Sequence, residues 1–157
     1  MSEPDLELAR RTLDAQPFSR LLGARVTAFG GGAAVLEVGV RDELLQQNGF
    51  LHGGVLAYAA DNALTFAAGT TLGVAVLTGG FSIQYVRPGA GRTLIARARV
   101  VHTGRRQATV RCDLVMVRDD GDEVLCAVAQ GTVLAAAPAT RPDPAPDPAE
   151  SGPAAPA

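Results

Sequence analysis

The sequence predicts an α+β fold in which an antiparallel sheet wraps around one long central helix. A long, almost uninterrupted apolar segment rich in Ala and Leu begins at Val55, and these residues favour helix. Segments that alternate apolar and polar residues follow it, which is typical of strands with one buried face. Short turns join those segments, so the strands are expected to pair in antiparallel fashion. One sheet that covers one helix is an α+β arrangement.

The length and the composition indicate a single domain with a full core. The chain has 157 residues, of which 47% are hydrophobic, and this is enough apolar material for one core. The net charge of −2 gives no electrostatic footprint for nucleic acid. We expect the folded domain over residues 1–136 and a disordered tail over residues 137–157, because Pro and Ala dominate the tail without apolar periodicity.

Nothing in the sequence predicts membrane insertion, a metal site or a resident cofactor. The N-terminus is acidic, and no apolar run is long enough to span a bilayer, so we expect a cytoplasmic protein with no membrane partner. Cys112 and Cys126 fall in expected strands and are interpreted as reduced core residues, with a disulfide between them as the alternative. His52 and His102 are the only histidines, so no metal-binding pattern forms.

The segments before the central helix predict a short helix and two strands. An amphipathic pattern predicts a helix over Pro4–Ala15, which ends before Pro17. Strands are expected over residues 25–29 and 33–40, joined by a turn of consecutive glycines. Residues 41–45 then form a connector of about one helical turn.

The central helix is expected over Val55–Ala68, with Gly69 at the position of a C-terminal glycine cap. Nearly every position in it is apolar, and a helix that is apolar all round is buried on most faces. Asp61 and Asn62 interrupt the run, which is also too short for a membrane span.

Four strands are expected after the helix, and they complete the sheet. Apolar residues alternate in the first of them at Phe81, Ile83 and Tyr85. Glycine-rich or acidic turns separate the strands. The expected ranges are 72–86, 93–102, 107–117 and 124–134.

Asp61 is the informative residue, because a carboxylate in a buried helix is costly unless it is hydrogen-bonded, paired or used. Two interpretations stay open. Asp61 could bond a neighbouring segment at the edge of the helix, or it could be a catalytic carboxylate. Thr65 follows four positions later and therefore shares its face, where it could position a water molecule or the carboxylate.

The start of the helix offers a second functional group. Backbone N–H groups in a first helical turn lack intrahelical partners, and the glycine at Gly53 lets a substrate oxygen approach. The Gly53 N–H could therefore stabilise an oxyanion. Gly53 and Asp61 are about 12 Å apart along a helix, too far to meet at one reacting centre. If both act on one carbonyl, they come from two subunits.

These residues resemble the hotdog-fold acyl-CoA thioesterases of the PaaI-like, phenylacetic acid degradation type. The resemblance covers residues 18–134. It is carried by four features of the sequence: the stretch Asn48-Gly49-Phe50-Leu51-His52-Gly53-Gly54, the helical Asp61, the stretch Phe81-Ser82-Ile83-Gln84-Tyr85-Val86-Arg87-Pro88, and Gly104-Arg105.

The resemblance implies a hotdog fold and a homodimer with paired sheets and interfacial active sites, often assembled as a homotetramer, a dimer of dimers. It implies that Asp61 attacks the thioester or activates water, and that the Gly53 N–H polarises the carbonyl. His52 would orient the loop or line the site, although it could also cap the helix by bonding a backbone carbonyl. A polar side chain among Gln46, Gln47 and Asn48 would hold the carbonyl or the water. Thr65 matches a helper position.

A second set of residues is expected to bind the substrate. Arg87, Arg105 and Arg106 could bind the coenzyme A phosphates, or they could be solvated turn residues. Gly79-Gly80 could leave room for an acyl group or mark a bulge. Tyr58 and Phe66 are expected in the core. The predicted substrate-binding residues are Gly54, Gly80, Phe81, Arg87, Gly104, Arg105 and Arg106.

The predicted activity is hydrolysis of a medium-chain or aryl-acyl-CoA thioester to a free acid and coenzyme A. Coenzyme A is part of the substrate, and no cofactor is expected. One alternative is an enoyl-CoA hydratase or dehydratase on the same fold, which needs a His and an acid placed for proton transfer. Another is a non-catalytic acyl-CoA-binding protein.

Overall fold

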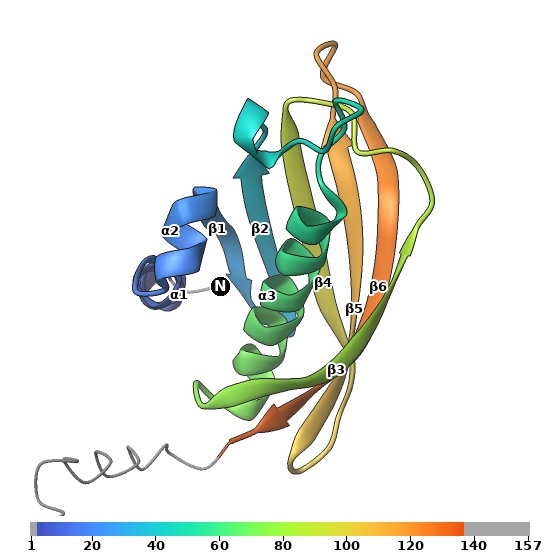
Figure 1. Cartoon of the computed structure of the whole chain (residues 1–157). Helices are drawn as coiled ribbons and strands as arrows, with labels where there is room; N and C mark the ends of the chain where they lie inside the picture. Colours follow the sequence, from blue (N-terminus) through green and yellow to red (C-terminus); the bar gives the residue numbers. More distant parts are fainter. Residues whose placement is uncertain (1–2, 137–157) are drawn as a thin grey trace, which may run out of the picture.

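The computed structural model describes residues 3–136, which form a six-stranded antiparallel sheet with one long helix against it (Figure 1). The residues predicted as a tail lie outside the described range. The elements are α1 Glu3–Asp14, α2 Pro17–Leu22, β1 Ala24–Gly30, β2 Ala33–Gly39, the 3-10 turn Asp42–Leu44, α3 Gly53–Leu72, β3 Val76–Tyr85, β4 Thr93–Thr103, β5 Gln107–Val117 and β6 Glu123–Ala135.

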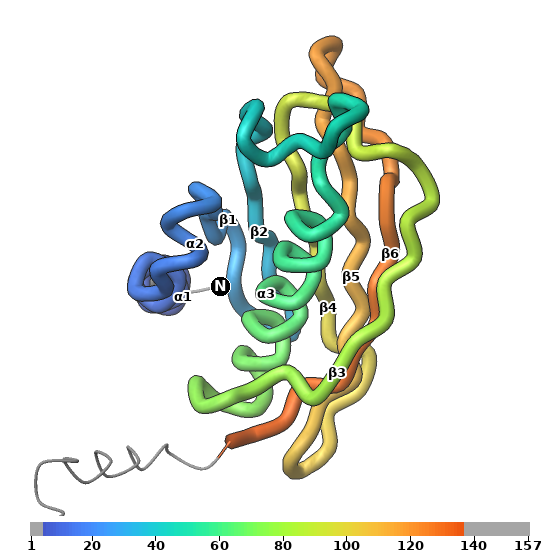
Figure 2. The backbone as a smooth tube through the Cα atoms, viewed as in Figure 1, coloured from blue at the N-terminus to red at the C-terminus, as the bar shows by residue number. Residues whose placement is uncertain are grey.

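The strand order is β1-β2-β4-β5-β6-β3. The chain therefore leaves β2, passes through α3 and returns to the far edge of the sheet as β3. Figure 2 follows this path from the end of α3 along β3 to the loop that leads into β4. The β4–β5–β6 part is a plain antiparallel meander. This arrangement confirms the α+β prediction of a sheet around a central helix.

The core lies between α3 and the inner face of the sheet. Strand positions that were predicted to alternate inward, such as Leu94 and Ala96 in β4 and Val110 and Cys112 in β5, are fully buried. On α3 the buried positions recur with the spacing of one helical face. They are Val55, Leu56, Ala59, Ala60, Ala63, Leu64, Ala67 and Ala68.

The opposite face of α3 is only half-buried, which corrects the expectation of a helix buried on most faces. Asp61, Thr65 and Phe66 lie on this face. The apolar composition of α3 is therefore not explained by the sheet of one chain alone.

The C-terminus of α3 also differs from the prediction. Gly69 lies inside the helix, which continues to Leu72, and Gly73 caps it with a φ of 95° and an N–H bonded to the Gly69 carbonyl. A Cβ at Gly69 would lie 3.8 Å from Val76 Cγ2 at the start of β3, an ordinary van der Waals contact, so neither space nor backbone conformation requires a glycine there. The positive φ that favours glycine falls at residue 73.

Strand β3 is an edge strand that pairs only with β6 among the described strands. Its register with β6 shifts between Thr78 and Gly80, so the two glycines there mark a bulge, one of the two interpretations of that pair. Phe81 and Ile83 pack against the core. Tyr85 was expected in the same row, but it is 53% exposed because its hydroxyl reaches out to the start of α3.

Both cysteines are free and buried, so the disulfide alternative is wrong. Burial raises the pKa of the Cys112 thiol to about 12, with a smaller contribution from the neighbouring Asp113. Burial likewise raises the pKa of Cys126 to about 11. They behave as small core residues, as predicted. No helix within residues 3–136 has the length and hydrophobicity needed to cross a membrane, and the cytoplasmic location stays a prediction.

Candidate active site

Asp61 projects from the half-buried face of α3, and a side chain from β3 holds its carboxylate. The Thr78 hydroxyl donates to Asp61 Oδ1 over 2.5 Å. A hydrogen bond to an ionised group is among the stronger ones in proteins. Thr78 points inward because the bulge follows directly after it. The edge strand therefore fixes the orientation of the helical carboxylate.

Thr65 acts on this carboxylate through Thr78. The Thr65 hydroxyl lies 2.8 Å from the backbone carbonyl oxygen of Asp61 and 2.8 Å from Thr78 Oγ1. Because the Thr78 proton is donated to Asp61, the single Thr65 proton is shared between these two acceptors. The predicted proximity of Thr65 to Asp61 is confirmed, but the contact with the carboxylate is indirect.

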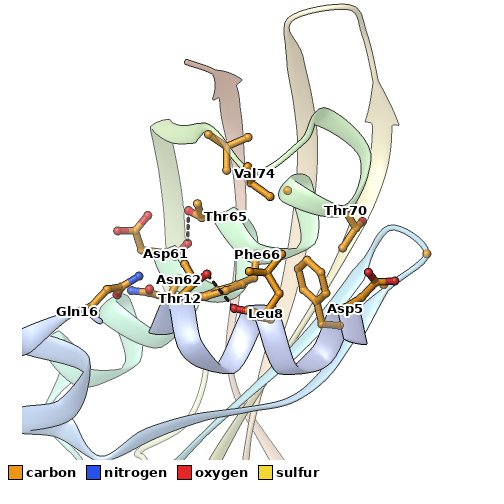
Figure 3. Close-up of a pocket in the computed structure, with 16 residues that line it drawn as sticks. Asp5, Leu8, Thr12, Gln16, Asp61, Asn62, Thr65, Phe66, Thr70 and Val74 are labelled. Carbon is orange, nitrogen blue, oxygen red and sulfur yellow. Dashed lines mark hydrogen bonds between the residues drawn. The ribbon is translucent and has the colours of Figure 1, made fainter. Parts of the chain in front are cut away.

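The other carboxylate oxygen, Asp61 Oδ2, accepts no hydrogen bond from any residue in 3–136. Asp61 lines a cavity of about 450 Å³ between α1, α3 and the β1–β2 turn, and Figure 3 shows it at one end beside Asn62 and Gln16. One oxygen is thus anchored, and the second is free to accept a proton or to attack a substrate.

The start of α3 is capped by His52. Its Nδ1 accepts a hydrogen bond of 2.9 Å from the Gly54 N–H, so the neutral imidazole carries its proton on Nε2. This is a helix cap, but it bonds an N–H group, whereas the expected cap bonded a carbonyl. The Gly54 N–H is occupied by this cap and is not available to a ligand.

The Gly53 N–H has no acceptor within the described part of the chain. It is the first helical residue, where N–H groups lack intrahelical partners and the helix dipole favours negative charge. The carbonyl of Gly53 accepts a hydrogen bond of 3.0 Å from the Tyr85 hydroxyl at the end of β3. The outward position of Tyr85 thus ties β3 to the start of α3 and leaves the N–H available.

The loop before α3 uses Gln46 to hold its own shape. The Gln46 side-chain oxygen accepts a hydrogen bond of 2.5 Å from the Asn48 N–H, and the Gln46 backbone bonds to Phe50 and Gly49. The Asn48 side chain is exposed and makes no hydrogen bond to residues 3–136. The three polar residues that sequence alone could not separate therefore differ in role, since Gln46 builds the turn and Asn48 projects from it.

One chain does not bring all the predicted catalytic residues together. Asp61, Thr65 and Thr78 gather around one point, whereas Asn48, His52 and Gly53 lie at the start of α3. Neither His52 nor Gly53 lines the cavity that contains Asp61. Helical rise places Gly53 and Asp61 about 12 Å apart.

The predicted substrate-binding residues also form two groups within one chain. Arg87 lies at the end of the sheet where α3 begins, and it donates to the Leu125 carbonyl. Gly104, Arg105 and Arg106 form the β4–β5 turn at the opposite end (Figure 1). The 11 residues of β4 separate the two groups by roughly 36 Å. Gly80 and Phe81 line no cavity described here.

Sequence reasoning missed several residues around Asp61. Phe66 packs against the core, as expected, but it also lines the cavity, which was not predicted. Tyr58 packs edge-on against Phe18 and donates to the buried Ser19 hydroxyl, and desolvation raises its pKa. Ser19 in turn bonds Gln16, which lines the cavity. For Thr78, the signal in the sequence was its position just before a glycine pair, but its inward direction depends on the bulge at that pair.

Comparisons with known proteins identify thioesterases as relatives of this chain. The model of the thioesterase superfamily matches residues 48–126. This range includes most of the loop before α3 and Asp61. The acyl-coenzyme A thioesterase PaaI of Escherichia coli is 29% identical over 73% of this chain and 82% of its own length.

Solved structures give the same result. A thioesterase family protein from Silicibacter pomeroyi superposes with a TM-score of 0.78 at 30% identity, over 83% of this chain and 96% of that one. The phenylacetic acid degradation protein PaaI of Thermus thermophilus gives a TM-score of 0.66 at 37% identity, over 76% of this chain and 98% of that one. The chain therefore belongs to the thioesterase superfamily and has the hotdog fold that the residues around Asp61 and Gly53 predicted.

Proposed function

We propose that this protein is an acyl-CoA thioesterase that hydrolyses a medium-chain or aryl-acyl-CoA thioester to a free acid and coenzyme A. The observation that carries the proposal is the state of Asp61. One of its oxygens is fixed by Thr78 and the other is free at the end of a cavity. Membership of the thioesterase superfamily and the likeness to an acyl-coenzyme A thioesterase support the reaction class.

In this mechanism Asp61 Oδ2 performs the first chemical step. Either it attacks the thioester carbonyl to form a mixed anhydride that water then cleaves, or it takes a proton from a water molecule that attacks the same carbon. In both routes the C–S bond breaks, the water molecule supplies a hydroxyl group to the free acid, and its remaining proton neutralises the thiolate, so that coenzyme A is released as a thiol. The Thr65–Thr78 pair keeps Oδ1 in place, so that Oδ2 meets the reacting carbon in one orientation.

The oxyanion donor in this proposal is the Gly53 N–H of a second copy of the chain. The unpaired edge of β3 and the half-buried outer face of α3 favour a homodimer in which these surfaces meet. If two α3 helices lie antiparallel about a two-fold axis near Ala57, midway between Gly53 and Asp61, each Asp61 comes beside the partner's Gly53. Each dimer would then contain two shared sites, and a dimer of dimers is compatible with this geometry.

The remaining site residues have supporting roles in the proposal. The exposed Asn48 side chain holds the thioester carbonyl or the water, while Gln46 shapes the loop and His52 caps α3. The Arg87 guanidinium of one subunit and Arg105 or Arg106 of the other bind the coenzyme A phosphates, since the two groups lie too far apart in one chain for one ligand.

The test is release of free thiol from a panel of acyl-CoA thioesters that runs from acetyl to long-chain and includes phenylacetyl. Wild type is compared with Asp61→Asn, and Asp119→Asn in the exposed β5–β6 turn is the matched control. We expect hydrolysis by wild type and the control, and a fall of roughly 10²- to 10⁴-fold in the Asp61 variant. Hydrolysis of no thioester by a folded wild-type protein would refute the proposal.

A further inference from the structure

The cavity next to Asp61 has an apolar middle and polar ends. It lies between the outer face of α3, the N-terminal helix α1 and the β1–β2 turn. The large apolar residues that line it are Leu8, Phe29, Phe66, Val74 and Val76. In Figure 3 the polar residues Gln16, Thr12 and Asn62 gather at the Asp61 end, and Asp5 and Thr70 lie at the other.

The shape of this cavity suits an extended chain. Asp61 and Thr70 stand nine positions apart on α3, which corresponds to about 13 Å of helix axis. Because bonds of about 1.5 Å zigzag, an extended hydrocarbon chain advances about 1.25 Å per carbon, and roughly ten to eleven carbons cover that length. The volume of about 450 Å³ also leaves room for an aromatic ring.

We propose that the acyl group of the thioester occupies this cavity, and that α1 forms the wall that decides which acyl groups fit. The proposal rests on the proposed thioesterase activity, and it assigns a binding role to Leu8 and Phe66. The thioester carbon sits at the Asp61 end, and the acyl chain runs between Leu8 on α1 and Phe66 on α3 toward Asp5. Each further methylene that the cavity buries strengthens binding of the chain, because its apolar surface leaves water.

The charges of the cavity limit the chemical class of the acyl group. Among residues 3–136, Asp5 and Asp61 are the only charged residues that line it, and both are acidic. An acyl group that ends in a carboxylate would place its negative charge near the Asp5 carboxylate, and like charges that lie close together repel each other. The cavity therefore selects neutral acyl groups of medium length.

The first experiment closes the cavity from the α1 side. Leu8 lines the cavity and is 43% exposed, so a Trp side chain fits there without a clash with the core. Leu21 on α2 is the control, because it is 66% exposed and does not line this cavity. We expect Leu8→Trp to lower the ratio of kcat/KM for decanoyl-CoA over butyryl-CoA by at least about tenfold, because an occupied pocket discriminates by chain length. Leu21→Trp should leave this ratio within about twofold. If wild type hydrolyses thioesters but Leu8→Trp leaves this ratio unchanged, the cavity proposal is wrong and the thioesterase proposal still stands.

A second comparison tests the charge. Decanoyl-CoA and sebacoyl-CoA have acyl chains of the same length, and both reach the far end of the cavity, but only sebacoyl ends in a carboxylate. Wild type should hydrolyse decanoyl-CoA at least about tenfold faster, because the terminal carboxylate loses hydration and meets the Asp5 carboxylate. Equal rates would contradict the assignment of the chain end to the region of Asp5.

A third measurement is independent of turnover. The chain has no Trp, so Val74→Trp at the rim of the cavity, where Val74 is 83% exposed, creates a single fluorescent reporter. A neutral medium-chain fatty amide with a terminal bromine should quench it, and the same ligand should not quench Leu21→Trp. Absence of quenching in Val74→Trp overturns the cavity proposal. Quenching without hydrolysis of any thioester overturns only the proposed function.

Discussion

The Thr78 hydroxyl lies 2.5 Å from Asp61 Oδ1, and this bond joins the edge strand β3 to the central helix at the candidate active site. Removal of the donor frees the carboxylate to rotate. We expect Thr78→Val, which keeps the shape of the side chain, to lower kcat by roughly ten- to a hundredfold. This corresponds to a hydrogen bond to a charged group worth about 1.5–3 kcal/mol.

Steady-state kinetics on the best thioester measure this effect, and Thr78→Ser is the control because it retains the hydroxyl. Full kcat in Thr78→Val would mean that Asp61 needs no anchor.

Gly53→Pro tests the oxyanion donor without a change in the helix. Pro has no N–H but fits the first position of a helix, and His52 before it has φ −61° and ψ 136°, a conformation that a residue preceding Pro prefers. We expect a fall in kcat of about 10²- to 10³-fold.

Gly53→Ala keeps the N–H, and its added Cβ would lie at an ordinary 3.5 Å from the Tyr85 ring, so it should retain most activity. Circular dichroism and the melting temperature establish that both variants fold. Equal kinetics of the Pro and Ala variants would exclude the N–H as a donor.

Mixed dimers test whether a site takes residues from two chains. Asp61→Asn and Gly53→Pro should each be nearly inactive alone. In a mixed dimer, one site carries both substitutions and the other carries neither, so we expect activity to return to about half of the wild-type value per dimer.

The two variants are co-expressed with different tags, and the mixed dimer is isolated by two affinity steps. Each purified parent is the control. An inactive mixed dimer would place Asp61 and Gly53 in separate roles.

Gly131 controls how closely β3 approaches β6. A Cβ at this position would lie 2.6 Å from Phe81 Cβ and 2.7 Å from the Gly80 carbonyl oxygen, so β3 would have to move. We expect Gly131→Ala to lower the free energy of unfolding by about 1–3 kcal/mol, measured by urea denaturation. Because Thr78 belongs to the displaced strand, kcat should fall as well.

Gly39→Ala in β2 is the matched control, since a Cβ there meets no atom within 4 Å. If both variants unfold at the same urea concentration as wild type, the close approach of β3 to β6 has no energetic importance.

The buried thiols predict a loss of stability at alkaline pH. The folded-state pKa values of about 12 for Cys112 and about 11 for Cys126 exceed the ordinary thiol value of about 8.5. The unfolded chain therefore loses these protons first. The contribution of the protonated thiols is complete below pH of about 8.5 and is lost as pH rises toward these folded-state values.

Urea denaturation across this pH range measures the effect, and the double variant Cys112→Ala, Cys126→Ala should show a shallower decline than wild type. Parallel declines would contradict the pKa assignment. Iodoacetamide at a pH of about 8, below the ordinary thiol pKa, should label neither thiol before unfolding.

The fold could be predicted from the sequence, because hydrophobic periodicity and turn-forming residues are properties of short segments of the chain. The alternation in β4 and β5, and the acidic turn before β6, were read correctly from neighbouring residues. The end of α3 was not, because two glycines that lie four positions apart, Gly69 and Gly73, could each have supplied the cap. Only the backbone shows that the positive φ falls at Gly73.

The candidate site was predictable in its two main groups and not in their surroundings. Asp61 stood out as a carboxylate among apolar residues, and Gly53 as a glycine at a helix start. Thr78 could not be identified, because its inward direction depends on a bulge whose register is set by β6, far along the chain. The cavity-lining role of Phe66 could not be predicted, because the sequence does not reveal which face of an apolar helix the sheet leaves uncovered.

The strand order also has a consequence for biosynthesis. Strand β3 lies at the edge of the sheet, and β6, its partner, is the last of the described strands to leave the ribosome. Until Glu123–Ala135 has emerged, β3 has no partner strand that would fix the position of Thr78. The nascent chain therefore lacks the hydrogen bond that orients the Asp61 carboxylate. Synthesis of β6 is therefore a precondition for the geometry at Asp61, and a truncated product that ends before β6 would be expected to carry the helix but not the site.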